Sequence, residues 1–310
     1  SARARRPRHP SFSLGGPSKI SAAARAARGG RVPPQLRRSP KGRPSTHLTS
    51  AARPQRALFA SYPMAVTGPV LFFDCDDCLY KNEWAVAKML TARIEEYCIG
   101  QLGLRPGYAY DLYKKYGTAL RGMQEEELLD ERRLEEYLVF AHDVPLESHI
   151  APDAHLRAIL EAVDPSVPKY VFTASTRPHA MRCLKALGVE DLFVDVIDVR
   201  ASGWHTKHSA GAYEAAMRIA GVSDPSNAYF LDDSTSNMKA AKAAGWRTML
   251  VGRHARDTGA EVQCEHADHV VDTIHEFPRR WPQFFPAGIP PAGPEGLVED
   301  AVPAEELVEK

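Results

Sequence analysis

The sequence predicts an α/β fold: a Rossmann-like parallel sheet with helices on both faces and an inserted helical cap. Three observations predict it. Short apolar runs alternate with helical patterns through the middle of the 310-residue chain. Two of these runs end directly in aspartates. Between the first and second runs, residues 81–150 show only helical periodicity. Hydrophobic residues make up 44% of the chain, which is enough for a buried core, and no apolar run approaches the ~20 residues of a membrane-spanning helix.

The predicted strands are continuous runs of β-branched and aromatic residues, a pattern typical of strands buried on both faces. In chain order they are expected at residues 70–73, 169–173, 193–197, 228–231, 247–251 and 269–271. Helices between them are expected at residues 178–187, 209–220 and 236–244, each followed by a glycine that favours a left-handed C-terminal cap. Strand and helix in alternation predict parallel pairing.

The helical cap is expected to comprise residues 81–150, inserted between the first and second core strands. Apolar residues recur at three- and four-residue spacings in segments 83–99, 108–116 and 130–139, so each is expected to form a helix. A cap at this point would lie over the carboxyl ends of the strands, where an open α/β sheet binds its ligand. The core is then expected to comprise residues 67–80 and 151–278.

Both ends of the chain are expected to be disordered. Residues 1–66 are rich in Arg, Ser, Pro, Gly and Ala and lack a periodic apolar stripe, so they are predicted to form a basic leader. Such a composition is typical of a transit peptide, which would direct the protein to a mitochondrion or plastid. The alternative is a solvated tail or an over-extended gene model that really begins at Met64, which leaves a cytoplasmic protein. Residues 279–310 are predicted to form an acidic, Pro-rich tail.

Charge and cysteine content exclude some functions. Residues 1–73 contain 14 Lys and Arg and no acidic residue, so the remainder holds 25 basic against 39 acidic residues, a net charge of −14. An acidic folded part is unsuited to nucleic-acid binding. Five cysteines without regular spacing do not make a disulfide scaffold and indicate a reduced, intracellular protein. We therefore expect neither nucleic acid nor membrane as a partner, and the oligomeric state stays open.

Paired aspartates predict a metal site at the strand ends. Asp74 and Asp76 follow the first strand, and Asp232 and Asp233 follow the fourth. Residues two apart on an extended chain face the same side, so Asp74 and Asp76 are expected to converge. Converging carboxylates repel one another unless a divalent cation holds them, and hard oxygen ligands suit Mg²⁺. The alternative, that these are ordinary turn formers, is less favoured because both pairs follow apolar strands.

A phosphate site is predicted beside these aspartates. Thr173 ends the second strand, and the turn from Ala174 opens a helix whose N-terminal N–H groups could bind an anion. Lys207 precedes the next helix and is expected to supply a mobile positive charge. Taken singly, the threonine could be a helix cap and the lysine a surface charge. As a set they favour a phosphorylated ligand.

The order of these motifs resembles the haloacid dehalogenase superfamily of phosphatases. Residues 72–80, Phe-Phe-Asp-Cys-Asp-Asp-Cys-Leu-Tyr, are similar to the Phe-Phe-Asp-x-Asp-x-x-Leu-Tyr signature of its pyrimidine 5′-nucleotidase branch. Residues 113–122 of the helical cap, 179–184 and 229–234 are also similar to that branch. The resemblance runs from about residue 71 to 252 and leaves out both ends of the chain.

The resemblance implies a role for each motif residue. Asp74 would be the nucleophile that forms an aspartyl-phosphate, and Asp76 the general acid and then the base for water. The phosphoryl group would be bound at Thr173, Ala174 and Lys207. Mg²⁺ would be held by Asp74, the carbonyl of Asp76 and Asp232, with support from Asp233. Two positions depart from the family pattern: Ala174 stands where Asn is common, and His208 where Pro is usual.

These roles predict a Mg²⁺-dependent phosphomonoester hydrolase, most specifically a pyrimidine 5′-nucleotidase acting on the nucleoside monophosphates UMP and CMP. The alternatives are a phosphatase for phosphoglycolate, pyridoxal phosphate or a sugar phosphate, and a non-catalytic phosphate-binding module. In the helical cap, Tyr113, Tyr116 and Arg121 are candidates for substrate specificity, although their helical spacing also suits ordinary packing. An aspartate at position 76 favours phosphate-ester chemistry, because it can protonate an ester oxygen.

Some cysteines and histidines allow further interpretations. Cys75 and Cys78 form a Cys-x-x-Cys around Asp76. A disulfide between them would distort this loop and could act as a redox switch, but small core residues in a buried loop explain them more simply. His205 and His208 flank Lys207, and a zinc site there is not expected because no Cys or third His lies near in sequence.

Overall fold

The computed structural model describes residues 66–254 and 259–291. Six parallel strands form one sheet in the order β3-β2-β1-β4-β5-β6, which confirms the predicted fold class. The strands are β1 (Val70–Phe73), β2 (Lys169–Phe172), β3 (Asp195–Ile197), β4 (Ala228–Asp232), β5 (Arg247–Val251) and β6 (His269–Val271).

The predicted leader, except for Val66, and residues 292–310 of the predicted tail lie outside the described residues. Among the described helices, none is both long and apolar enough to cross a membrane.

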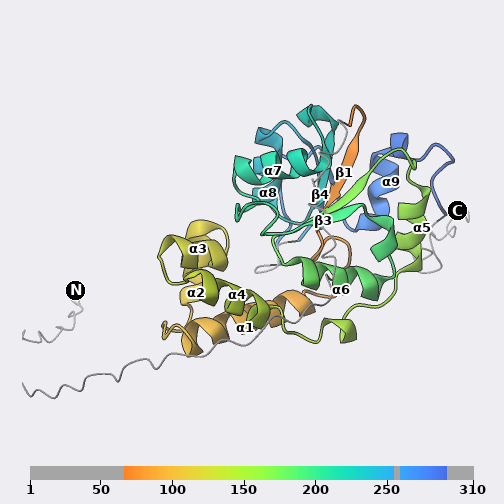
Figure 1. Ribbon diagram of the computed structural model, residues 1–310. Coiled ribbons are helices and arrows are strands. Elements are labelled where there is room, and N and C mark those ends of the chain that lie inside the picture. The colour runs from red at the N-terminus through yellow and green to blue at the C-terminus, as the bar shows by residue number, and fades with distance from the viewer. Residues whose placement is uncertain (1–65, 255–258, 292–310) are drawn as a thin grey trace, which may run out of the picture. The chain divides into compact units, whose positions relative to one another are not determined.

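Helices cover both faces of the sheet, because successive residues of each strand point to opposite sides. Leu71 and Phe73 of β1 pack into one core cluster with α5 (Ala154–Ala162) and α6 (Arg177–Leu187). Val70 and Phe72 pack into the other with α7 (Ala210–Ala220) and α8 (Thr235–Ala243). Figure 1 shows α7 and α8 on one side of the strands and α5 and α9 (Phe277–Arg280) on the other. Burial on both faces explains why these strands read as unbroken apolar runs.

Local signals define the core helices. α5 begins after Asp153, whose carboxylate accepts a hydrogen bond from the Leu156 N–H at 2.8 Å. The sequence analysis did not single out this helix. α6 and α7 end at Gly188 and Gly221, which adopt the left-handed conformation that glycine tolerates. The predicted glycine stops are therefore confirmed at these two helices.

The predicted start of the C-terminal tail at residue 279 is wrong. α9 (Phe277–Arg280) and the 3₁₀ turn η5 (Pro282–Phe284) fold against the sheet, and Trp281 and Phe284 are buried. The Asp164 N–H donates to the carbonyl of Phe284 at 2.8 Å. Pro278 and Pro282 sit in first helical turns, where no N–H is needed, so these two prolines start short helices and do not signal disorder.

We predict that Phe284→Ala lowers the free energy of unfolding by about 3–5 kcal/mol, because it removes a fully buried aromatic side chain and leaves a cavity. Chemical denaturation would measure this change. Arg279→Ala is the matched control, because Arg279 is exposed two residues beyond the start of α9 and should change stability by less than about 0.5 kcal/mol. Equal effects of the two substitutions would restore the tail prediction.

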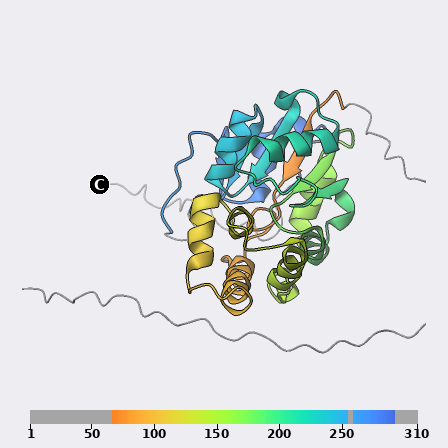
Figure 2. The same cartoon turned by 60° about the vertical axis from the view of Figure 1, so that its left-hand side comes forward.

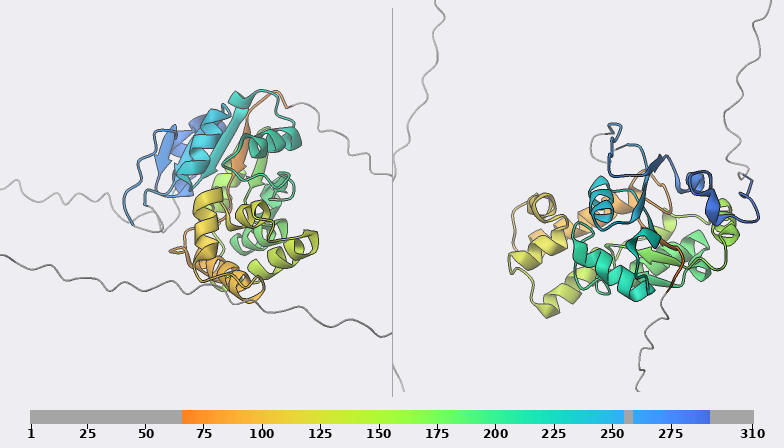
Figure 3. Two further views of the ribbon diagram at one scale, coloured as in Figure 1. Left: turned by 90° about the vertical axis from the view of Figure 1, so that its left-hand side faces the viewer. Right: turned by 90° about the horizontal axis from the view of Figure 1, so that it is seen from above.

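Residues 81–150 contain four α-helices and the 3₁₀ turn η1 (Leu146–Ser148). The α-helices are α1 (Ala85–Gly100), α2 (Tyr108–Tyr116), α3 (Ala119–Glu125) and α4 (Glu131–Ala141). They share a small apolar core of their own, in which Tyr97, Leu112, Met123 and Leu138 are buried. Figures 2 and 3 show these helices gathered around one another as a group beside the sheet layers. Helix α3 was not predicted, because a seven-residue helix is too short to show periodicity.

Two glycines allow close packing of the helical cap. A Cβ at Gly122 would lie 2.6 Å from the Leu112 Cβ, so only glycine lets α2 and α3 approach this closely. Gly117 has a φ of +88° and faces the ring of His208, where a Cβ would lie 2.2 Å from Nδ1. The helical cap therefore touches the core at the residue that follows Lys207. A second link is the ion pair between Arg200 and Glu135 at 2.5 Å.

Candidate active site

The two central strands bring three predicted site aspartates together. β1 and β4 are neighbours in register, and the Asp74 N–H donates to the carbonyl of Leu231 at 2.8 Å. Carboxylate oxygens of Asp74, Asp232 and Asp233 lie within 4.8 Å of one another. Asp74 and Asp232 are buried and Asp233 is exposed. The prediction that paired aspartates converge from two strand ends is therefore correct for these three residues.

Lys207 lies between two of these carboxylates. Its Nζ is 2.8 Å from Asp74 Oδ1 and 2.6 Å from Asp232 Oδ2, and it donates to the Phe172 carbonyl at 3.2 Å. Burial by itself would lower the pKa of Lys207, but the two carboxylates raise it above its usual range, so the ammonium stays charged. The expectation of a mobile charge is wrong, and so is the alternative of a surface charge: this lysine is buried and held on three sides.

The carboxylates repel one another. Burial, together with the charges of Asp232 and Asp233, raises the pKa of Asp74, and Lys207 only partly opposes this. Desolvation and then the charges of Asp232 and Asp77 also raise the pKa of Asp233; because Asp233 is exposed, we attribute its shift chiefly to the neighbouring charges. Hard oxygen donors that crowd together in this way fit a divalent cation such as Mg²⁺.

The orientation of Asp232 is fixed by groups that the sequence analysis missed. Asn237 Nδ2 donates to both carboxylate oxygens of Asp232, at 2.9 and 3.0 Å, and the Ser234 N–H donates to Oδ1 at 2.8 Å. The Tyr213 hydroxyl donates to the carbonyls of Lys207 and Asn237, at 2.8 and 2.9 Å. No motif pointed to Asn237 or Tyr213, because each acts through another residue of the site.

The carboxylate of Asp76 points away from that cluster. Its Oδ1 lies 2.8 Å from His179 Nε2 and accepts from the Tyr80 hydroxyl at 2.6 Å, and its Oδ2 accepts from the Ser175 hydroxyl at 2.9 Å. The expected side-chain convergence of Asp74 and Asp76 is therefore wrong. The physical reason is a turn over residues 76–79, with Asp77 at a φ of 58°, because two-residue alternation holds only for an extended chain.

Asp76 and His179 form an ion pair. Burial alone would raise the pKa of Asp76, but the His179 charge and the hydrogen bonds from His179, Tyr80 and Ser175 lower it below its usual range. Burial alone would lower the pKa of His179, and the Asp76 charge and hydrogen bond instead raise it to about 10. His179 begins residues 179–184, which are similar to the nucleotidase branch, but the sequence gives no signal for its role.

The predicted phosphate-binding residues Thr173 and Ala174 follow the carboxyl end of β2, next to the strand end that carries Asp74. Thr173 is buried directly after β2, the neighbour of β1, and its Oγ1 accepts from the Ser175 N–H at 3.0 Å. Ala174 is exposed. The N-terminus of α6 is less open than expected, because the Arg177 N–H donates to Asp198 Oδ2 at 3.0 Å.

Residues 69–245, more than half of the chain, match the family described as haloacid dehalogenase-like hydrolase. The chain belongs to this family of hydrolases. The chain is 28% identical to phosphate metabolism protein 8 of Saccharomyces cerevisiae over 191 residues. The aligned region covers 57% of this chain and 59% of the yeast protein. The matched region thus spans less than two thirds of that relative. The pyrimidine 5′-nucleotidase branch stays a prediction.

Solved structures of the haloacid dehalogenase-like fold are also similar to the chain. CbbY from Rhodobacter sphaeroides in complex with phosphate has a TM-score of 0.51 at 18% identity, covering 67% of this chain and 95% of CbbY. A mutant of CbbY in complex with xylulose-(1,5)-bisphosphate has a TM-score of 0.50 at 17% identity, with the same coverage. At these identities the likeness shows the fold.

Of the three candidate specificity residues of the helical cap, Arg121 lines a cavity and the two tyrosines do not. Arg121 lines a small cavity between α3 and the loop after β3, and it pairs with Glu125. Tyr113 is 44% exposed and packs against Tyr110, and the Tyr116 hydroxyl donates to Glu126 at 3.2 Å. Neither tyrosine lines the cavity. Its lining consists of Thr118, Leu120, Arg121, Gln124, Ala174, Val199, Trp204, His205 and Thr206.

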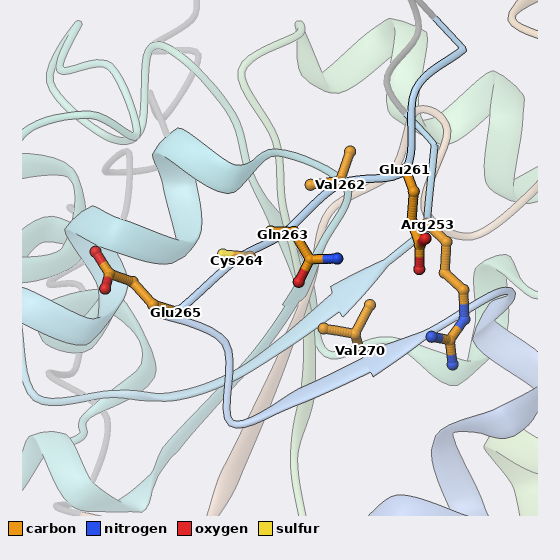
Figure 4. A pocket seen from close by; sticks show the side chains of 7 residues that line it. All are labelled: Arg253, Glu261, Val262, Gln263, Cys264, Glu265 and Val270. Atoms are coloured by element: carbon orange, nitrogen blue, oxygen red, sulfur yellow. The ribbon is translucent and has the colours of Figure 1, made fainter.

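A larger hollow of about 320 Å³ lies at the β5–β6 edge of the sheet. Figure 4 shows Arg253 and Glu261 at one end of it and Glu265 at the other. It shares no residue with the aspartate cluster, and none of its lining residues is among the predicted site residues. We therefore place the candidate active site at the ends of β1, β2 and β4.

We predict that Asp74→Asn leaves a folded protein with less than about a hundredth of the parent kcat, because the amide keeps the size but removes the anionic nucleophile. Turnover of a chromogenic phosphate ester would measure activity, and circular dichroism would confirm folding. Higher residual turnover would contradict an aspartyl-phosphate mechanism.

We also predict that Mg²⁺ affinity rises between about pH 6 and pH 8, because the raised pKa values of Asp74 and Asp233 make protons compete with the metal at lower pH. Calorimetric titration with Mg²⁺ in buffers of different ionisation enthalpy would measure both affinity and proton release. A pH-independent affinity without proton release would show that the carboxylates are already ionised before the metal binds.

Proposed function

We propose that the protein is a Mg²⁺-dependent phosphomonoester hydrolase that acts through an aspartyl-phosphate. One observation carries this proposal: the Asp74 carboxylate lies against a fixed ammonium and beside two further carboxylates at the end of a central strand. A nucleophile in this position would meet a phosphoryl group whose charge Lys207 helps to neutralise. Bound Mg²⁺ would neutralise the rest of that charge and keep the carboxylates ionised.

Hydrolysis then proceeds in two displacements. An oxygen of Asp74 attacks phosphorus, and the bond from phosphorus to the ester oxygen breaks; that oxygen takes a proton from Asp76. In the second step Asp76 takes a proton from water as the water attacks phosphorus and releases Asp74. Asp74 Oδ1 accepts from Lys207, so we assign the attack to Oδ2.

Asp76 has to move for the first step. In the structure its carboxylate is ionised and bound by His179, Tyr80 and Ser175. An acid must carry a proton and reach the leaving oxygen, so Asp76 rotates out of these hydrogen bonds when substrate is present. The arrangement in the structure is therefore a resting position of the acid.

The comparisons support phosphate-ester chemistry. A protein of the same fold binds phosphate, and its mutant binds a sugar bisphosphate. The yeast relative is named for phosphate metabolism. Asp76, two residues after the nucleophile, supplies the proton that an ester oxygen needs and that a carbon–halogen bond does not.

We further propose that the substrate is a pyrimidine nucleoside monophosphate, on the similarity of residues 72–80 to the nucleotidase signature, and that the cavity beside Ala174 receives the nucleoside. Trp204 lines this cavity with a φ of 65°, a conformation that costs a non-glycine residue about 1–3 kcal/mol and often marks function. Its indole offers a stacking face for a base. Gln124 Oε1 is buried there without a hydrogen-bond partner among the described residues, and would accept from a base N–H.

The cavity has a volume of about 30 Å³, which holds about one water. A nucleoside therefore enters only if α3 moves away from the loop after β3. This requirement supports a lid movement of the helical cap, with the cap selecting the leaving group and the core binding phosphate.

We predict higher kcat/KM for UMP and CMP than for AMP, GMP, phosphoglycolate or pyridoxal phosphate, measured by phosphate release from a panel of these esters. Arg121→Ala should lower kcat/KM for the preferred nucleotide by the equivalent of about 1–3 kcal/mol, because it leaves a polar group of the substrate unmatched. It should barely change turnover of acetyl phosphate, which does not reach α3.

Lys114→Ala is the matched control, since Lys114 is a cation of the same helical cap outside the cavity lining. Equal losses on nucleotide and acetyl phosphate would place Arg121 in folding of the helical cap. Equal kcat/KM on phosphoglycolate and UMP would refute the nucleotidase proposal and leave the phosphatase proposal intact.

A further inference from the structure

A second group of side chains of the types that bind metal ions lies between the loop after β1 and α6. The Sγ atoms of Cys75 and Cys183 and a carboxylate oxygen of Asp76 lie within 4.8 Å of one another. His179 adjoins them, with its Nε2 3.6 Å from Cys183 Sγ and 2.8 Å from Asp76 Oδ1. Two sulfurs and one oxygen thus lie close together, and one imidazole nitrogen lies beside the Asp76 and Cys183 members of this group. The cluster of Asp74, Asp232 and Asp233 shares no member with this group.

The fold brings these four residues together in two pairs. His179 and Cys183 are four residues apart on α6, so their side chains lie on one face of that helix. Cys75 and Asp76 belong to the loop after β1. Cys78, which we had considered as the redox partner of Cys75, is outside the group, and its thiol lies 3.5 Å from the Leu231 carbonyl.

The chemistry of this group suits a different cation from Mg²⁺. Thiolate and imidazole are preferred ligands of Zn²⁺, which takes four ligands in a tetrahedron, whereas Mg²⁺ takes oxygen ligands. All cysteines of the chain are free thiols in the structure. Cys75, Cys183 and His179 are almost fully buried, and the Asp76 side chain is 18% exposed, so an ion would enter past Asp76.

We propose that Cys75, Asp76, His179 and Cys183 form an inhibitory Zn²⁺ site. Bound Zn²⁺ would hold the Asp76 carboxylate as a ligand and keep it from the leaving oxygen, so turnover stops while Mg²⁺ still occupies the aspartate cluster. Inhibition rests on the proposed function of Asp76. Binding of the ion does not, and the two are measured separately.

Binding is tested with Co²⁺ as a spectroscopic probe on the reduced full-length protein at saturating Mg²⁺. We expect one equivalent of Co²⁺ to give a thiolate-to-cobalt charge-transfer absorption that Zn²⁺ abolishes. Cys183→Ser should weaken this absorption, because only the Cys75 thiolate remains, and should bind Zn²⁺ at least about 10-fold more weakly, because losing a direct ligand costs at least as much as losing an outer-shell partner. Cys264→Ser, at a thiol remote from the group, should retain both. Absence of the charge-transfer band in the parent protein would overturn the site without reference to any variant.

Inhibition is tested with a chromogenic phosphate ester at saturating Mg²⁺. We expect Cys183→Ser to keep the basal turnover and to need at least about 10-fold more Zn²⁺ for inhibition than the parent. Equal inhibition of both proteins would place the effect at the aspartate cluster and overturn the proposal. A cobalt band without inhibition by Zn²⁺ would overturn the inhibitory role. A protein that hydrolyses no ester would refute the proposed function, while the cobalt band would still decide the metal site.

Discussion

The buried ammonium of Lys207 is the interaction on which the site depends. It lies between Asp74 of β1 and Asp232 of β4, so it links the ends of the two central strands. Without it, the two buried carboxylates of Asp74 and Asp232 would face each other without a counter-charge, and removing one partner of a buried ion pair typically costs about 3–5 kcal/mol. The Tyr213 hydroxyl extends the network to α7 and α8, because it binds the carbonyls of Lys207 and Asn237. Two strands and two helices are thus fixed around one charge.

The turn after Asp74 directs the side chains of Asp74 and Asp76 to two different groups of residues. Asp74 stays on the side of Lys207, with hard oxygen donors for Mg²⁺. Asp76 turns toward α6, where it meets an imidazole and two thiols. The left-handed conformation of Asp77 makes this division possible within three residues. In the proposed mechanism, the same turn keeps the acid apart from the nucleophile until a substrate arrives.

Sequence patterns predicted the features that depend on local physics. All six strands were found because burial on both faces gives unbroken apolar runs, and Asp74 and Asp232 were found because they end two of these runs. The patterns failed where tertiary contacts decide. A lysine is normally exposed, so nothing indicated that Lys207 is buried. Cys75 and Cys183 are more than a hundred residues apart, and only the sheet and α6 bring them together. Trp281 and Phe284 lie among prolines, whose presence outweighed the aromatic residues in the sequence analysis.

Under the proposed mechanism, the loop after β2 couples substrate entry to proton transfer. Ser175 holds the Asp76 carboxylate, and its neighbour Ala174 lines the cavity beneath α3. A leaving group that enters this cavity meets the loop at the residue next to the one that restrains the acid. Asp76 loses three hydrogen bonds when it turns, and the leaving oxygen offers one new partner. Turning is therefore unfavourable in the free enzyme, and under the proposed mechanism contacts between the substrate and the helical cap have to offset it. This explains why specificity for the leaving group would appear in kcat as well as in KM.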